Sequence, residues 1–185
     1  SAPIACPFID GRHGAILRAW LPIDVPTVLN AGTDAGITNM FPVPTDGDTL
    51  SALSYMSKMS SRMILGSALA FAIADVDNTA VGYLGVGLGS LWQGRIIVGY
   101  WIAPKYRGHG FQTRALNTLV EWSEQVGSVS RVEAHIDPHN AASIRAAEKA
   151  GFLYEATLRN WEIANGVPKP MSIYARLVTP RVPGA

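Results

Sequence analysis

The residues best suited to chemistry lie in one stretch, 99–115, which reads G-Y-W-I-A-P-K-Y-R-G-H-G-F-Q-T-R-A. Pro104 ends a strand-like run, the turn R-G-H-G follows at 107–110, and a helical pattern begins almost at once. Glycines let the backbone approach a ligand closely, and the first amides of a helix have no partner within it. Together with the helix dipole, these amides favour an anion such as a diphosphate.

This loop taken alone also fits a plain strand-to-helix turn with a basic rim. Lys105, Arg107 and Arg114 supply positive charge on either reading. The Walker pattern is excluded because no Gly-Lys-Ser/Thr follows the glycines, and the dinucleotide fingerprint is excluded because Thr113 stands where a small residue is needed. A second series, Gly85, Gly87 and Gly89, precedes a strand and therefore favours close backbone approach over phosphate binding.

A second cluster follows at 137–152, with the sequence D-P-H-N-A-A-S-I-R-A-A-E-K-A-G-F. Asn140 stands at the start of a helical pattern that follows a strand, and Ser143 lies one turn further on the same face. Asn140 alone is typical of an N-cap, and Ser143 alone is typical of a first-turn residue. Both would face the end of the first helix if the two preceding strands lie side by side.

Glu133 and His135 share one side of a predicted strand because alternate residues point the same way. Imidazole has an ordinary pKa of about 6.5 and suits a general base, whereas a carboxyl group would need help from burial. Purely structural roles for both stay open, and so does a water chain without a dedicated base. We expect His109 and His139 to be solvated and His13 to have no partner. No histidine pair has the spacing of metal ligands, so no metal site is predicted.

Hydrophobic periodicity and turn residues give the order of the elements. Asp24 and either Asp46 or Asp48 are expected N-caps, 32–44 is expected to be a loop, and the three strands over 69–103 should form an antiparallel meander. The predicted strands are 15–21, 69–75, 80–92, 95–103, 131–137, 152–161 and 171–177, and the predicted helices are 24–30, 46–63, 112–127 and 140–150. The fold class is therefore mixed α/β, of the α+β type.

Two motifs in register carry a resemblance to a known family. R-x-x-G-x-Q at 107–112, with N-x-x-S-x-x-x-x-E-K-x-G-F at 140–152, resembles the GNAT superfamily of acyl-CoA N-acyltransferases. L-R-A-W at 17–20 and L-R-N-W at 158–161 resemble its RimJ/RimL branch of ribosomal-protein N-terminal acetyltransferases. The resemblance spans nearly the whole chain and is strongest over 95–177.

The resemblance implies a twisted mixed sheet of seven strands flanked by about four helices, with 95–103 and 131–137 splayed apart to bind coenzyme A. The cosubstrate would be acetyl-CoA or another acyl-CoA. The residues expected to contact it are Tyr100, Trp101, Ile102, Arg107, Gly108, His109, Gly110, Phe111, Gln112, Thr113, Asn140 and Ser143. Gln112 departs from the family, which prefers Gly or Ala there, and Ala147 stands where many relatives have a tyrosine.

The implied function is transfer of an acetyl or other short acyl group to a primary amine, on a small molecule, a lysine or a protein N-terminus. Ser143 is expected to bond or protonate the departing thiolate, with Tyr174 as a weaker alternative. Direct transfer in a ternary complex is expected because the single cysteine, Cys6, is far from the motifs. Open alternatives are a succinyl or longer donor and a CoA-binding sensor without turnover.

The acceptor pocket is expected between 32–48 and the 162–170 turn, where Asp34, Asp46, Asp48 and Glu162 would favour a cationic acceptor. The composition of the 185 residues, 48% hydrophobic and 16% charged with a net charge of +1, excludes a disordered chain and a strongly basic nucleic-acid binder.

No signal-peptide layout opens the chain and the longest apolar stretch is interrupted, so we expect a cytoplasmic protein that does not enter membranes. A single domain over 1–185 is expected, with its core at 12–178 and flexible ends. The sequence leaves open a homodimer through an edge strand.

Overall fold

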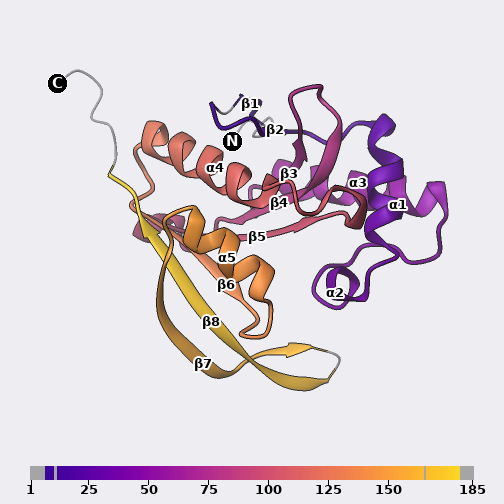
Figure 1. Ribbon diagram of the computed structural model, residues 1–185. Helices are drawn as coiled ribbons and strands as arrows, with labels where there is room; N and C mark the ends of the chain where they lie inside the picture. The colour runs from indigo at the N-terminus through magenta and orange to yellow at the C-terminus, as the bar shows by residue number, and fades with distance from the viewer. Residues whose placement is uncertain (1–6, 11, 165, 180–185) are drawn as a thin grey trace.

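The computed structural model describes residues 7–10, 12–164 and 166–179. A mixed eight-stranded sheet, in the order β1-β2-β3-β4-β5-β6-β8-β7, forms its centre (Figure 1). The strands are β1 Ile9–Asp10, β2 Ile16–Arg18, β3 Ala68–Ala74, β4 Ala80–Gly87, β5 Arg95–Ile102, β6 Arg131–Ile136, β7 Leu153–Ala164 and β8 Val167–Leu177. The α-helices are α1 Val25–Ala31, α2 Ala35–Thr38, α3 Thr49–Ile64, α4 Phe111–Val126 and α5 Ala141–Lys149.

The sheet separates two hydrophobic cores because successive side chains of a strand point to opposite faces. In β3, Phe71 and Ile73 join the core that includes α4, whereas Ala70 and Ala72 join the core that includes α1 and α3. Figure 1 shows α4 and α5 in front of the sheet, with α1, α2 and α3 gathered at one end. The helices therefore cover different parts of the two faces.

Local sequence signals account for the ends of the long helices. The Asp48 carboxylate accepts a hydrogen bond of 3.0 Å from the Ser51 amide and begins α3, and Gly127 closes α4 with a φ of 73°. Leu50, in the first turn of α3, is 72% exposed and lies outside the core. No helix among the described residues is long and apolar enough to cross a membrane.

The predicted mixed fold and the antiparallel meander β3-β4-β5 are confirmed. The strand count was one too low because two residues, Ile9 and Asp10, add the edge strand β1 to β2. A short helix, α2, forms inside the predicted loop 32–44, so the described residues contain five α-helices where about four were expected. The strand predicted over 80–92 ends at Gly87, and a 3₁₀ turn occupies Leu91–Gln93.

Close backbone packing explains one of the three alternating glycines. A Cβ atom on Gly85 would lie 2.2 Å from the Tyr83 hydroxyl oxygen and 2.7 Å from its ring carbon Cζ, so a side chain there would require the buried Tyr83 ring to move. A Cβ atom on Gly87 would make only an ordinary contact at 3.7 Å, and nothing lies near Gly89. The expected close approach is therefore confirmed at Gly85 alone.

Asp24 does not cap α1 with its side chain, contrary to the sequence-based expectation. Its carboxylate instead accepts two hydrogen bonds from the Arg18 guanidinium, at 2.7 and 3.0 Å, and one from the Leu21 amide at 2.8 Å. The guanidinium also donates to the Asn78 side chain and carbonyl. Arg18 and Asp24 are both 4% exposed, so this buried ion pair ties β2 to the β3–β4 turn.

We predict that Asp24→Asn lowers the free energy of unfolding by about 3 kcal/mol, because removal of one partner leaves the other charge buried and uncompensated. Urea denaturation of the purified protein measures this change. Arg12→Ala is the control, since the Arg12–Glu121 pair has a 79% exposed guanidinium side chain and its loss should cost under about 1 kcal/mol. Equal losses in the two variants would contradict the prediction.

Candidate functional site

The parallel strands β5 and β6 stop pairing halfway along their length. They are in register from Arg95↔Arg131 to Val98↔Ala134, and no pair follows. Beyond this point β5 remains paired with β4 as far as Ile102, and β6 remains paired with β8 as far as Ile136. The predicted splay between 95–103 and 131–137 is therefore confirmed, and the seam opens after Val98 and Ala134.

A line of unpaired amides stands at the open end of this seam. The backbone N–H groups of residues 108–113 donate to no other described residue, and the first helical bond of α4 runs from the Arg114 amide to the Gly110 carbonyl. Gly108 and Gly110 have φ angles of 80° and 74°, which glycine adopts without strain. The loop therefore presents a row of donors at the positive end of a 16-residue helix.

Two predicted site residues use their side chains to hold the helices beside the seam. The Tyr100 hydroxyl donates to the Ser143 carbonyl at 3.3 Å, and the Thr113 hydroxyl donates to the Ala146 carbonyl at 3.3 Å. Burial raises the pKa of Tyr100, so the phenol stays neutral. These bonds fix α5 against β5 and α4.

Asn140 is the N-cap of α5, as one of its two sequence readings predicted. Its side-chain oxygen accepts a hydrogen bond of 3.1 Å from the Ser143 amide, which leaves the amide nitrogen of the side chain available. Ser143 is 8% exposed, and its hydroxyl forms no hydrogen bond with another described residue. The two side chains therefore bring free polar groups to the helix end beside the seam.

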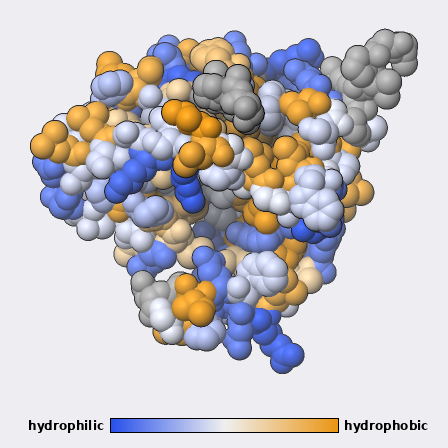
Figure 2. Space-filling model, turned by 180° about the vertical axis from the view of Figure 1, so that it is seen from behind, coloured by the Kyte–Doolittle hydropathy of each residue, from blue (hydrophilic) through white to orange (hydrophobic). Residues whose placement is uncertain are grey.

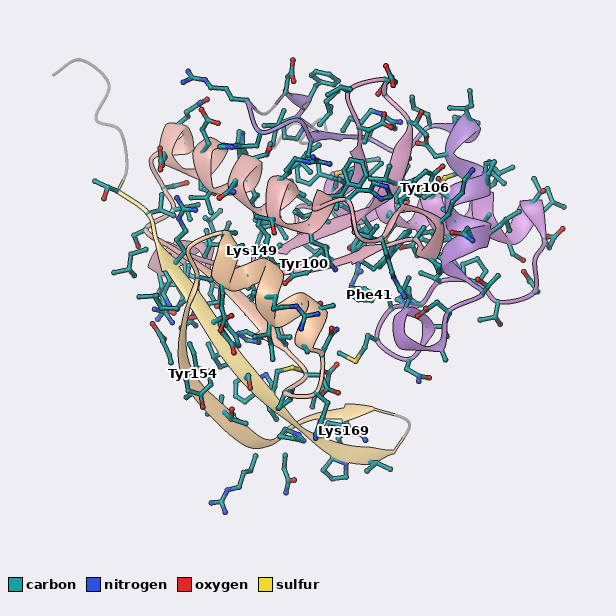
Figure 3. The ribbon with its side chains drawn as sticks, in the orientation of Figure 1. Phe41, Tyr100, Tyr106, Lys149, Tyr154 and Lys169 are labelled. Atoms are coloured by element: carbon teal, nitrogen blue, oxygen red, sulfur yellow. The ribbon has the colours of Figure 1, made fainter. Side chains whose placement is uncertain are left out.

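A cavity of about 670 Å³ follows the seam between α2, β5, the 106–113 loop and α5. In Figure 3, Tyr100 lies between α4 and α5, and Phe41 lies beside α2 across from it. The predicted residues that line the cavity are Tyr100, Trp101, Ile102, Arg107, Gly108, Gly110, Phe111, Gln112, Thr113, Asn140 and Ser143. His109 is not among the lining residues and is exposed, as expected of a residue in this turn.

His135 lines the same cavity and belongs to a chain of charged groups on β6. Its Nε2 atom lies 2.9 Å from a Glu133 carboxylate oxygen, and the Arg131 guanidinium donates to the other Glu133 oxygen at 2.7 Å. Burial alone raises the pKa of Glu133, but the hydrogen bonds from Arg131 and His135 outweigh it and leave the pKa below its ordinary value. The carboxylate is therefore ionised at neutral pH and fixes the His135 ring.

Two candidates from the sequence lie outside the cavity lining. Glu133 contacts the cavity only through His135, and Tyr174 packs on Tyr154 within the α4–α5 core, with ring centroids 5.5 Å apart. Burial raises the pKa of Tyr174. Ala147, at the position where many relatives have a tyrosine, is fully buried. The described geometry thus leaves Ser143 as the predicted hydroxyl that reaches the seam.

The side of the cavity formed by α2 contains residues that the motifs did not indicate. Ile37, Met40 and Phe41, in or just after α2, line the cavity. They fall inside the segment 32–48, whereas no described residue of 162–170 lines it. Seen from behind, the molecule is hollowed near its middle, where hydrophilic and hydrophobic residues meet (Figure 2). Composition alone gave no signal for Phe41, because its position depends on a four-residue helix.

Arg107 and Asp34 connect the α2 side of the cavity to the loop of residues 107–113, the amide loop. The Arg107 guanidinium donates to the Asp34 carboxylate at 2.8 Å and to the Ile102 carbonyl at 3.2 Å. The other Asp34 oxygen accepts from the Ile37 amide and caps α2. The hydrogen bond from Arg107 outweighs burial and holds the pKa of Asp34 below its ordinary value.

Two of the other expected acceptor acids are also engaged: Asp46 accepts hydrogen bonds from the Ser51 hydroxyl and the Asp48 amide, and Asp48 caps α3. His13 does have a partner, contrary to expectation, with its Nε2 atom 3.5 Å from Glu121. His139 is exposed and contacts Asp137 at 3.1 Å.

No group of three or more His, Cys, Asp or Glu side chains in the described ranges could hold a metal ion. Cys6 lies outside the described residues.

Comparison with known proteins agrees with this geometry. The ribosomal-protein-serine acetyltransferase of Escherichia coli is 28% identical over 81 residues, which cover 44% of this chain and 45% of that protein. Most of the curated relatives are matched over less than half of their own length.

Solved structures share the fold at lower identity. A Salmonella typhimurium acetyltransferase, described as modifying the N-terminal serine of ribosomal protein L7/L12, has a TM-score of 0.77 at 20% identity and covers 93% of this chain and 99% of its own. Mycobacterium smegmatis RimJ in complex with CoA-disulfide has a TM-score of 0.73 at 22% identity, covering 95% and 88%. At such identities these structures show the fold alone.

A family model decides the assignment. The model described as Acetyltransferase (GNAT) domain matches residues 15–153, which include the seam, the amide loop and α5. The name of the E. coli relative agrees with the resemblance to the RimJ/RimL branch. This chain belongs to the GNAT family of acetyltransferases, as its two motifs predicted.

Proposed function

We propose that this protein moves an acetyl or other short acyl group from acyl-CoA to a primary amine. The parting of β5 and β6 beside the free amides of 108–113 carries the proposal. A diphosphate suits a row of N–H donors at a helix start, and a pantetheine arm carries amides that can pair with an open strand edge. The CoA complexes among proteins of this fold support the same cosubstrate.

The residues present fit two parts of this cosubstrate, the diphosphate and the pantetheine arm. The amides of 108–113 would hold the diphosphate. The edge of β5 at 100–102, which has no pairing with β6, would pair with the pantetheine arm. The free side-chain nitrogen of Asn140 would donate to that arm. Gln112 does not conflict with this assignment, because the backbone and not the side chain supplies the donors.

In the proposed reaction the acceptor nitrogen forms a bond to the acyl carbon while the carbon–sulfur bond breaks. His135 would accept the proton that nitrogen loses. Glu133 holds the His135 Nε2 atom, so Nδ1 is the nitrogen left to accept the proton. His135 is suitably placed because it directly follows Ala134, the last paired residue of β6 at the seam.

Ser143 would donate a hydrogen bond to the sulfur as its negative charge develops. A serine nucleophile needs a base within hydrogen-bond reach, and no described side chain is bonded to the Ser143 hydroxyl. This absence supports direct transfer in a ternary complex over an acyl-enzyme.

A protein N-terminus is the acceptor that we favour. The names of the E. coli relative and the Salmonella structure support it, and a ribosomal acceptor would place the protein in the cytoplasm. An α-amine has an ordinary pKa of about 7.7–8.0 and is more often neutral than a lysine at about 10.4. Asp34 and Asp46 are used in capping and pairing, so they give little support to a polycationic acceptor.

The first test combines a thermal shift with a thiol assay. We expect acetyl-CoA to raise the melting temperature, since a ligand that binds only the folded state stabilises it, and to release free thiol with at least one amine of a panel. The panel contains peptides with free N-termini, Nα-acetyl-lysine and small amines. Stabilisation without thiol release on any amine would favour a sensor, and no shift with any acyl-CoA would overturn the proposal.

The second prediction concerns the amide loop. We expect Gly110→Ala to weaken CoA binding about tenfold, because alanine at a positive φ costs roughly 1–2 kcal/mol and distorts the row of donors. Titration calorimetry with CoA measures the affinity. Gly47→Ala is a matched control, since Gly47 has a φ of 70° and equally open surroundings but lies outside the cavity. Equal affinities for the two variants would contradict the assignment.

The third prediction tests His135 as the base and Tyr174 as the alternative donor to the thiolate. We expect His135→Gln to lower kcat about 100-fold, the size of a general-base contribution, with little change in acetyl-CoA affinity. Tyr174→Phe keeps the ring in its core and should leave kcat unchanged. The thiol assay on the best amine of the panel gives both values. A comparable loss of kcat in Tyr174→Phe would contradict its placement in the core and would give the Tyr174 hydroxyl a part in the reaction.

A further inference from the structure

We propose that Phe41 determines the length of the acyl group that this site accepts. The inference rests on the proposed function, and it concerns the sheet face on which the acyl group would lie. Three features carry it: the point where the seam opens, the contact between Phe41 and Gly99, and the bonds that hold α2.

The seam fixes where the acyl end of the cosubstrate stops. A chain that enters from the 108–113 loop and follows β5 cannot pass Val98, because β5 and β6 are paired there. The first residues beyond the last pair are Gly99 and His135. Val98 and Ala134 point into the core with α4, so by alternation Gly99 and His135 face the opposite side of the sheet. The acyl carbon would therefore lie between these two residues.

Phe41 covers Gly99 on that face. A Cβ atom built on Gly99 would lie 3.5 Å from Phe41 Cε1 and 3.7 Å from Cζ, which is ordinary van der Waals contact. The ring thus lies in the space into which a side chain longer than alanine at position 99 would extend. Phe41 is half-buried, lines the cavity and lies beside α2 in Figure 3. An acyl chain that extends past the carbonyl on this face meets the ring.

Three sets of contacts hold Phe41: one to its backbone, one to helix α2 that precedes it, and one to its ring. The Phe41 amide donates to the Ile37 carbonyl at 2.8 Å at the end of α2. Asp34 caps the start of α2 and pairs with Arg107 of the amide loop. The edge of the ring packs on Tyr83, with centroids 5.9 Å apart and planes at 71°. A side chain fixed in this way can discriminate by size, because a larger group can enter only if the ring moves.

The consequence is a preference for acetyl over longer donors. Each methylene that a pocket rejects or accepts changes discrimination by about 10-fold or more. The methyl group of acetyl-CoA needs little room beyond the thioester carbonyl. Butyryl and hexanoyl chains would need the volume that the Phe41 ring occupies, so their affinity should fall in the wild-type protein.

Titration calorimetry with CoA, acetyl-CoA, butyryl-CoA and hexanoyl-CoA tests this inference without an acceptor. We expect the wild type to bind acetyl-CoA at least about tenfold more tightly than butyryl-CoA, and Phe41→Ala to remove or invert that ratio while its affinity for CoA stays unchanged. Leu50→Ala removes a similar apolar side chain from an exposed position on α3 and should keep the wild-type ratio.

Phe41→Leu serves as a second variant in case loss of the ring destabilises the fold, and it should give an intermediate ratio. An unchanged ratio in folded Phe41→Ala or Phe41→Leu would overturn the inference and leave the proposed function standing. A wild type that binds all acyl-CoA species equally would overturn it as well. Failure of the wild type to bind CoA at all would instead overturn the proposed function.

Discussion

The seam between β5 and β6 is the constraint on which the other features of the site depend. Beyond Val98 and Ala134 each strand keeps its outer neighbour, so the sheet opens along one line without losing its remaining pairs. Buried backbone N–H and C=O groups need partners. A ligand with amides of its own can supply them along an open strand edge, and this need is the physical basis for the proposed cosubstrate.

Side chains and backbone groups around this seam have different partners. The hydroxyls of Tyr100 and Thr113, both expected to contact the cosubstrate, bond to carbonyls of α5. Arg107 likewise contacts Asp34 and the Ile102 carbonyl. The backbone amides of 108–113 are left free, together with the Asn140 side-chain nitrogen and the Ser143 hydroxyl. Recognition by the backbone, as proposed, would be compatible with glycine at positions 108 and 110 and with a long side chain at position 112.

Most of the fold could be predicted because its longer elements carry their own signals. The helical period over 112–127 and the closing glycine were sufficient for α4, and apolar runs bounded by turn residues were sufficient for the central strands. The short elements failed for a common reason. α2 has four residues and depends on the Asp34 cap and on Arg107, 73 positions away. β1 has two residues and exists only through pairing with β2.

The sequence by itself determined the glycine turn at 107–110, the Asn140 cap and the two motifs that resemble the family, because each of these depends on residues close together in the chain. Only the tertiary structure decided which candidates share the cavity. It brings His135 opposite Gly99 and leaves Tyr174 in the core, since strand register and side-chain parity set the facing residues. It also lays Phe41 over Gly99, a contact between segments that no local pattern links.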